Sequence, residues 1–143
     1  MKINDVLRGK GTDVVTISPD ATVRELLALL AEHNVGALVV SSDGASVAGI
    51  VSERDVVRHL HRDPDAFNTP VQSIMTAEVH TCDTDAHIDD LMRLMTEERI
   101  RHVPVVVNGS LHGIVSIGDV VKTRIGELEF EREQLSKYIT SSS

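Results

Sequence analysis

An internal repeat is the feature of this sequence that most constrains its fold. The segment Thr16–Ala21 recurs as Thr81–Ala86, 65 residues further along the chain. More pairs follow in the same order: Leu26 with Leu91, Leu30 with Met95, Asp43-Gly44 with Asn108-Gly109, Gly49–Ser52 with Gly113–Ser116, and Asp55–Val57 with Asp119–Val121. Because an ordered series of matches marks a duplicated structural unit, we expect two similar halves.

Each half predicts the same order of elements, β-α-β-β-α. Apolar residues recur on one face of each expected helix, and the pairs Asp43-Gly44 and Asn108-Gly109 are typical of tight turns between strands. The first half predicts strands at 14–17, 36–40 and 47–51 and helices beginning near Thr22 and Ser52. The second predicts strands at 79–82, 102–107 and 111–115 and helices beginning near Ile88 and Ser116. One unit of about 50 residues buries its apolar faces poorly, so the predicted α+β fold packs two units about a pseudo-twofold axis.

The repeat divides the chain into four predicted parts. Residues 1–62 hold the first motif with an N-terminal lead-in, 63–70 a polar linker, 71–125 the second motif, and 126–143 a C-terminal helical extension with a tail expected to fray at 140–143. In the extension, Leu128, Leu135 and Ile139 recur at steps of seven and four residues, which predicts one narrow apolar helical stripe. We expect this stripe to serve dimerisation.

Composition narrows the function classes. Only three of the 143 residues are aromatic, and 22 Asp and Glu against 14 Lys and Arg leave a net charge of −8. A single-strand binder needs stacked rings and a duplex binder a basic face, so nucleic acid is not the expected partner. Cys82 is the only cysteine, which excludes an internal disulfide and favours a reducing, cytoplasmic location. No apolar run approaches the roughly 20 residues of a membrane helix, and the first residues lack a signal-peptide core.

No motif points to catalysis. The sequence lacks a G-x-S-x-G nucleophile elbow and a Cys/His/Asn signature. Its seven histidines do not fall in a metal-binding pattern, and one cysteine is too few for a cysteine-based zinc site. We therefore expect no enzymatic activity, no catalytic cofactor and no metal.

Three motifs occur twice in the same order. They are the strand before a helix start (14–23 and 79–88), the apolar central strand (35–40 and 100–105) and the segment that ends in an S-x-x-D pattern (49–55 and 113–119). With Val71–Thr76 as a lead-in, residues 1 to 125 resemble a pair of CBS domains, the cystathionine-β-synthase motif, also called a Bateman module. The resemblance implies a regulatory or sensor module, commonly a homodimer, that binds an adenosine-containing ligand (AMP, ADP, ATP, NAD(H) or S-adenosylmethionine) in two clefts between the motifs.

The S-x-x-D pattern allows two interpretations. Ser52 with Asp55, and Ser116 with Asp119, can cap a helix, because the hydroxyl satisfies a backbone amide and the carboxylate suits the positive helix end. The same arrangement can bind a nucleotide, since a helix N-terminus attracts phosphate and an aspartate can accept both hydroxyls of a ribose. The two roles are compatible.

The resemblance assigns residues to two clefts, each combining the strands of one motif with the Ser/Asp turn of the other. The first cleft is expected to contain Lys10, Gly11, Thr12, Val14, Val35, Gly36 and Ala37 with Ile114, Ser116 and Asp119. The second is expected to contain Thr76, Val79, Ile100, Arg101 and His102 with Ile50, Ser52, Arg54 and Asp55.

The two clefts differ in charge and in the room they offer. Gly36 and Ala37 leave space for a flat ring in the first, and Gly9–Thr12 is predicted as a flexible loop from which Lys10 can reach a phosphate. Arg101 and His102 either hold phosphates in the second cleft or fill it. By charge, the second cleft should prefer a polyphosphate and the first a monophosphate or neutral tail. The alternative is a ligand-free scaffold with closed clefts, which acts only through an unidentified protein partner.

Overall fold

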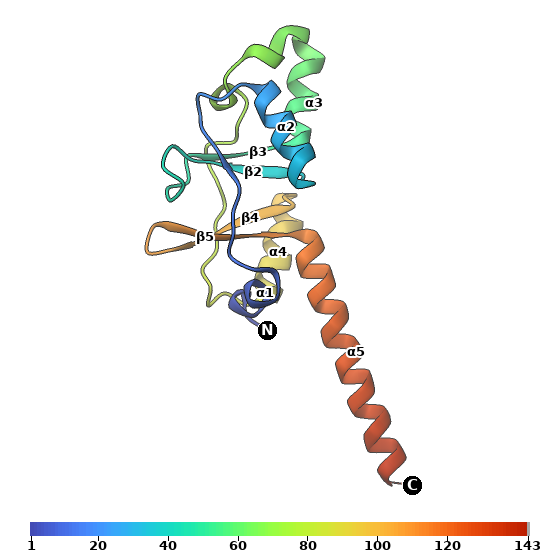
Figure 1. Cartoon of the computed structure of the whole chain (residues 1–143). Helices are drawn as coiled ribbons and strands as arrows, with labels where there is room; N and C mark the ends of the chain where they lie inside the picture. Colours follow the sequence, from blue (N-terminus) through green and yellow to red (C-terminus); the bar gives the residue numbers. More distant parts are fainter. Residues whose placement is uncertain (143) are drawn as a thin grey trace.

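Two small sheets, one from each repeat, form the framework of the structure (Figure 1). The computed structural model describes residues 1–142. Its helices are α1 (Ile3–Lys10), α2 (Val23–His33), α3 (Glu53–Arg62), α4 (Ile88–Glu98) and α5 (Ile117–Ser142). Its strands are β1 (Thr16–Ile17), β2 (Ala37–Val40), β3 (Gly49–Ser52), β4 (His102–Val107) and β5 (Ser110–Ser116). The tandem α+β arrangement predicted from the repeat is confirmed.

The two sheets follow one plan with one difference. β2 pairs in parallel with β1 and antiparallel with β3, and β4 pairs antiparallel with β5. The strand expected at 79–82 is reduced to a single parallel bridge between Cys82 and Val105. The cause is Pro104: its carbonyl accepts the Cys82 amide at 3.0 Å, but proline has no N–H with which to continue the ladder toward His80.

The first helix of each copy buries one apolar face. The Thr22 hydroxyl accepts the Glu25 amide at 3.2 Å, so α2 begins with the predicted capping box. The buried residues of α2 are Val23, Leu26 and Leu30, and those of α4 are Ile88, Leu91 and Met95. The 3.6-residue period therefore places both helices against their sheets.

The lead-in segments cross between the two copies. Ile3 and Leu7 belong to α1, a helix not expected from the sequence, and are buried in the core of the second copy. In return, Val71 and Ile74, which lead into the second copy, are buried in the core of the first. The N-terminal lead-in, grouped with the first motif on sequence grounds, therefore packs on the second. Each core is complete only with a segment from the other half.

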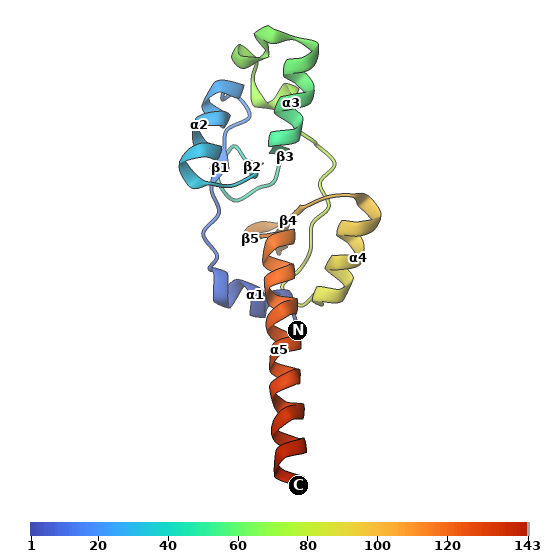
Figure 2. The same ribbon diagram turned by 90° about the vertical axis from the view of Figure 1, so that its right-hand side faces the viewer.

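Helix α5 joins the last predicted helix of the repeat to the C-terminal extension without a break. Of the tail expected to fray, residues 140–142 are helical, and Ser143 lies outside the described residues. The first turns of α5 pack on α1 and α4, where Val120 is 1% exposed. The C-terminal half projects beyond the rest of the chain (Figures 1 and 2). Within residues 1–142, no helix has the length and apolar character needed to cross a membrane.

Two glycines allow the lead-ins to approach the sheets closely. A Cβ on Gly49 would lie 2.5 Å from the Sδ of Met75 and 2.8 Å from the carbonyl oxygen of Thr76. Thr76 is held in place by backbone hydrogen bonds of 2.9 and 3.0 Å to β3. In the second copy, a Cβ on Gly113 would lie 2.9 Å from a methyl carbon of Leu7. A side chain at Gly49 would push the backbone of its crossing segment away, whereas one at Gly113 would meet the end of the Leu7 side chain.

We expect Gly49→Ala to lower the free energy of unfolding by about 1–3 kcal/mol, because the added methyl group meets backbone that cannot move aside. Gly126→Ala is the matched control: an added Cβ there has nothing within 4 Å, and alanine in a helix should raise stability by up to about 1 kcal/mol. Urea unfolding of both variants measures the difference. Equal effects of the two substitutions would contradict the close approach.

Candidate functional site

A cavity of about 540 Å³ lies between the two copies. It brings together all residues expected in the second cleft: Thr76, Val79, Ile100, Arg101, His102, Ile50, Ser52, Arg54 and Asp55. Three residues assigned to the first cleft line the same cavity: Gly36, Ala37 and Ser116. The other residues assigned to the first cleft do not line it: Lys10, Gly11, Thr12, Val14, Val35, Ile114 and Asp119.

Asp55 lies in the first turn of α3, on the wall of the cavity. Its Oδ2 accepts the Ser52 amide at 2.8 Å and the Ser52 hydroxyl at 3.1 Å. The Ser52 hydroxyl oxygen in turn accepts the Asp55 amide at 3.4 Å, which completes the capping box. Since Glu53 and Arg54 also line the cavity, the positive end of the α3 dipole lies at its wall.

Aliphatic side chains form the apolar part of the wall. An antiparallel bridge between Ile50 and Thr76 brings the second lead-in to the edge of the cavity. Val79 and Ile100 add branched side chains, and no Phe, Tyr or Trp is among the described residues that line the cavity. A flat ring bound here would therefore contact methyl groups and backbone, and the side-chain rings on the wall are the imidazoles of His80 and His102.

Arginines dominate the charged part of the wall. Four arginines line the cavity: Arg54, Arg58, Arg99 and Arg101. Three acidic residues line it as well: Glu53, Asp55 and Glu78. Arg58 and Arg99 were not among the residues predicted from the sequence. Arg58 lies four residues after Arg54 on α3, so helical spacing alone could have placed the two side by side.

Arg99 occupies a backbone conformation that disfavours it. It ends α4 with φ 55°, in the left-handed region, where the first copy has Asn34 with φ 51°. Glycine and asparagine are the usual residues at such helix ends, and another residue pays about 1–2 kcal/mol. A strained arginine on a cavity wall is typical of a functional position. The sequence carried a signal for this residue: Arg99 stands where the first copy has Asn34 at the end of its helix.

His102 lies where the central strands of the two copies meet. Its Cε1 lies 3.5 Å from the position of a Cβ on Gly36. Burial lowers the pKa of His102, and the charge of Lys10 adds to this effect, although Asp119 and Glu53 oppose it. Without a bound ligand, the neutral form of the His102 imidazole is therefore favoured over the cationic form.

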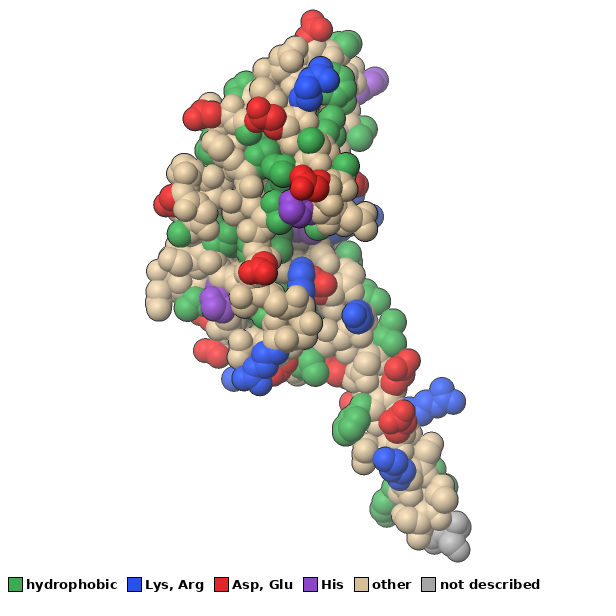
Figure 3. Space-filling model, viewed as in Figure 1, with side chains coloured by type: hydrophobic (Ala, Val, Ile, Leu, Met, Phe, Trp, Pro, Cys, Tyr) green, Lys and Arg blue, Asp and Glu red, His purple; other side chains and the backbone are tan. Residues whose placement is uncertain are grey.

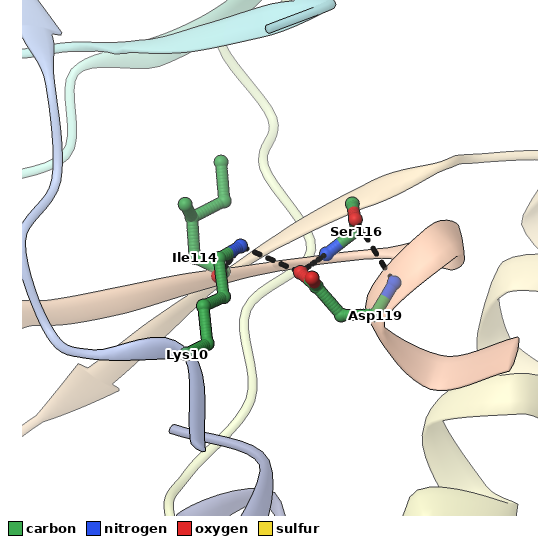
Figure 4. A network of polar contacts seen from close by, with 4 residues as sticks. All are labelled: Lys10, Ile114, Ser116 and Asp119. Atoms are coloured by element: carbon green, nitrogen blue, oxygen red, sulfur yellow. Dashed lines mark hydrogen bonds and ion pairs between the residues drawn. The ribbon is translucent and has the colours of Figure 1, made fainter. Parts of the chain in front are cut away.

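Lys10 binds the aspartate of the first cleft, which was predicted from the sequence to be the more open of the two (Figure 4). Its ammonium group donates to the Ile114 carbonyl at 2.7 Å and to Oδ2 of Asp119 at 2.5 Å. The same Oδ2 accepts the Ser116 amide at 2.8 Å. Burial raises the pKa of Asp119, but the hydrogen bonds from Lys10 and Ser116 outweigh it and hold the pKa below its ordinary value. Lys10 is the last residue of α1. The prediction of a flexible loop at 9–12 is therefore wrong for Gly9 and Lys10, which are helical.

The two lead-ins carry opposite charges beside their clefts. Leu7 contacts Gly113 as Met75 contacts Gly49, so the two lead-ins are equivalent. Three residues after Leu7 stands Lys10, and three residues after Met75 stands Glu78. A carboxylate cannot pair with the aspartate of its cleft, and Glu78 lines the cavity instead.

The described residues offer little for metal or thiol chemistry. Among residues 1–142 there is no group of three or more His, Cys, Asp or Glu side chains that could hold a metal ion. Burial, with a smaller contribution from Asp83, raises the pKa of the Cys82 thiol to about 11. The thiol therefore remains protonated near neutral pH and is a poor nucleophile.

Comparison with known proteins identifies the repeated unit. The family model of the CBS domain matches residues 5–62 and 71–126. A mitochondrial CBS domain-containing protein of Arabidopsis thaliana is 37% identical over 146 aligned residues, which cover 96% of this chain and 71% of that protein.

Solved structures agree with this family match. The crystal structure of a CBS-domain containing protein from Agrobacterium tumefaciens is 43% identical, with a TM-score of 0.83 over 87% of this chain and 99% of that one. The CBS domain pair of protein MJ0100, in complex with 5′-methylthioadenosine and S-adenosyl-L-methionine, has a TM-score of 0.79 over 89% of this chain and 98% of that one. At 23% identity this second likeness shows the fold. The chain therefore belongs to the CBS domain family, of which it contains a tandem pair.

Proposed function

We propose that this CBS pair is a regulatory module that binds an adenosine-containing ligand in the cavity beside Asp55. The observation that carries the proposal is the position of that carboxylate, at a helix N-terminus on the wall of a cavity built by both motifs. Methylthioadenosine and S-adenosylmethionine in the MJ0100 pair, which has the same fold, support the ligand class.

Each part of the ligand has a matching part of the wall. Asp55 accepts the two ribose hydroxyls, and Ile50, Val79 and Ile100 enclose the adenine ring. The phosphates lie toward the N-terminus of α3 and the arginines, because helix amides and guanidinium groups both favour negative charge. With four arginines against three carboxylates, ADP and ATP should bind more tightly than AMP or the cationic S-adenosylmethionine.

A ligand that contacts both motifs can act as a signal. It stabilises the arrangement of the two motifs in which its contacts are best, and so shifts the population toward that arrangement. We infer a cytoplasmic homodimer without enzymatic activity, whose change in packing is detected by a protein partner of unknown identity.

A ligand-free scaffold is the second candidate. The ion pair between Lys10 and Asp119 favours it, because a residue of the chain itself occupies the aspartate of one cleft. The open cavity beside Asp55 distinguishes the two candidates, since a scaffold has no use for it.

Binding to a panel of AMP, ADP, ATP, NAD, NADH and S-adenosylmethionine tests the proposal. A ligand at 100 times its dissociation constant adds about 2.7 kcal/mol of stability, which thermal unfolding detects. Asp55→Asn keeps an acceptor for the cap but loses the charge that holds the ribose, and should weaken ATP binding about tenfold or more. Asp119→Asn makes the same change in the equivalent capping box and should leave the affinity within about twofold. If no compound shifts the unfolding temperature, the scaffold is the better description; equal losses in the two variants would place the ligand elsewhere.

Arg99→Asn should separate stability from binding. Asparagine suits the left-handed conformation, so the free energy of unfolding should rise by up to about 1 kcal/mol. The lost guanidinium should weaken ATP binding about tenfold and AMP binding less, as isothermal titration can measure. Arg93→Asn is the control: Arg93 lies on the same helix, 70% exposed, and does not line the cavity. Equal loss of AMP and ATP affinity would argue against a polyphosphate contact.

Lys10→Met should make the aspartate of the first cleft available to a ligand. Methionine keeps the length of the side chain but cannot pair with Asp119, so the number of nucleotides bound per chain should rise from about one to about two at saturation. Lys137→Met, on the projecting part of α5, controls for the change in net charge. A stoichiometry that stays the same in Lys10→Met would show that the ion pair does not keep ligand out.

A further inference from the structure

Helix α5 has two distinct faces. One packs on its own chain: Val120 is 1% exposed, and Arg124 forms ion pairs of 3.5 Å with Asp89 and 3.1 Å with Glu127. Beyond Glu127 the helix leaves the rest of the chain, and hydrophobic side chains lie along it among charged ones (Figure 3).

The second face is an exposed apolar stripe, which we call the α5 seam. It consists of Val121, Ile125, Leu128 and Leu135, whose exposure is 48%, 51%, 54% and 62%. The steps between them are four, three and seven residues, and Ile139 follows four residues later. Alternating steps of three and four are the heptad spacing of a two-stranded coiled coil, with Ile125 at an a position and Leu128 and Leu135 at d positions. A stripe limited to a and d is narrower than the face by which a helix packs in a domain core.

The seam continues into a groove at the start of the helix. Ile117, Gly118 and Lys122 line this groove together with Val121 and Ile125. A partner helix that follows the seam would therefore reach the second motif and cover Ile117, which is 44% exposed. The most economical partner is the same helix of a second copy, because a heptad stripe is complementary to itself about a twofold axis.

Charges beside the seam select a parallel pair. In a parallel coiled coil, the g residue of one helix faces the e residue five positions later on the other. This sets Arg124, which also pairs with Asp89 and Glu127 of its own chain, opposite Glu129 of the second copy. In an antiparallel pair with the same overlap, Glu129 would face Glu129 of the second copy, and Glu131 would face Glu131 of the second copy. Both contacts would join two negative charges. Arg132, at an a position, extends toward Glu131 of the second copy in the parallel pair, and a single charged a residue favours two strands over more.

We propose that the α5 seam forms a parallel two-stranded coiled coil with a second copy of this chain, along the twofold axis of the dimer. The coil fixes the two CBS pairs side by side, with equivalent motifs together. The proposal rests on the homodimer of the proposed function, but not on its ligand.

Sedimentation equilibrium of the full chain tests the surface. The wild type should have twice the 15.6 kDa chain mass, and Leu128→Glu and Leu135→Glu should each raise the dimer dissociation constant at least tenfold. Phe130→Glu is the matched control, because Phe130 is apolar and 62% exposed on the same helix but lies outside the seam. A monomeric wild type, a larger assembly, or a dimer that Phe130→Glu weakens as much as Leu128→Glu would overturn the proposal. Far-UV circular dichroism confirms that each variant is folded.

Cross-linking tests the direction of the helices. Leu135→Cys in a Cys82→Ser background should form an intermolecular disulfide under mild oxidation, because a parallel coil places the two d residues in contact. Cys82→Ser alone should not cross-link. A dimer that Leu135→Glu dissociates but that Leu135→Cys does not cross-link would be antiparallel and would contradict the proposal.

Nucleotide titration keeps the two proposals separate. Leu128→Glu should still bind ATP at the cavity, since the seam does not line it. A wild-type dimer that binds no nucleotide would refute the ligand while leaving the coil intact; a nucleotide-binding monomer would refute the coil alone.

Discussion

The exchange of lead-in segments is the constraint on which the rest of the structure depends. Leu7 of the first lead-in is buried in the core of the second motif, and Val71 of the second lead-in is buried in the core of the first. Neither motif can complete its core alone, because one unit buries too little apolar surface to fold by itself. The crossing also places the end of each lead-in beside the Ser/Asp turn of the motif on which it packs. The cavity and the first cleft are therefore consequences of how the two cores are completed.

A symmetric framework with asymmetric residues explains why the two clefts differ. Both capping boxes have the same geometry, with backbone amides 2.8 Å from the aspartate oxygen. In one cleft Lys10 satisfies the remaining negative charge, whereas in the other Glu78 cannot. Under the proposed function, the carboxylate of Asp55 is the group that binds the ribose. The opposite charges of the two lead-ins thus give two similar capping boxes different surroundings.

The repeat made much of this predictable, and the limits of prediction have physical causes. Periodicity and the S-x-x-D pattern predicted the order of elements and the capping boxes, because these depend on residues close in sequence. The crossing of α1 depends on which core has room for Ile3, and the lost strand at 79–82 depends on the register of Pro104. Arg99 reaches the cavity through a backbone conformation that propensity argues against. Its departure from the asparagine of the first copy was the one sequence signal for it, whereas the packing of α1 and the register of Pro104 had none.

The cavity and the α5 seam share part of their surface, which gives the two proposals a common physical basis. Arg101, Ile117 and Gly118 line both the cavity and the groove at the start of the seam. The Ile117 amide donates to the Arg101 carbonyl at 2.8 Å, so the residue before β4 is linked directly to the first turn of α5. A phosphate that draws Arg101 into the cavity would alter the groove that a second copy covers. Because coupling between two binding events is reciprocal, dimer formation would change nucleotide affinity by the same factor by which nucleotide changes the dimer.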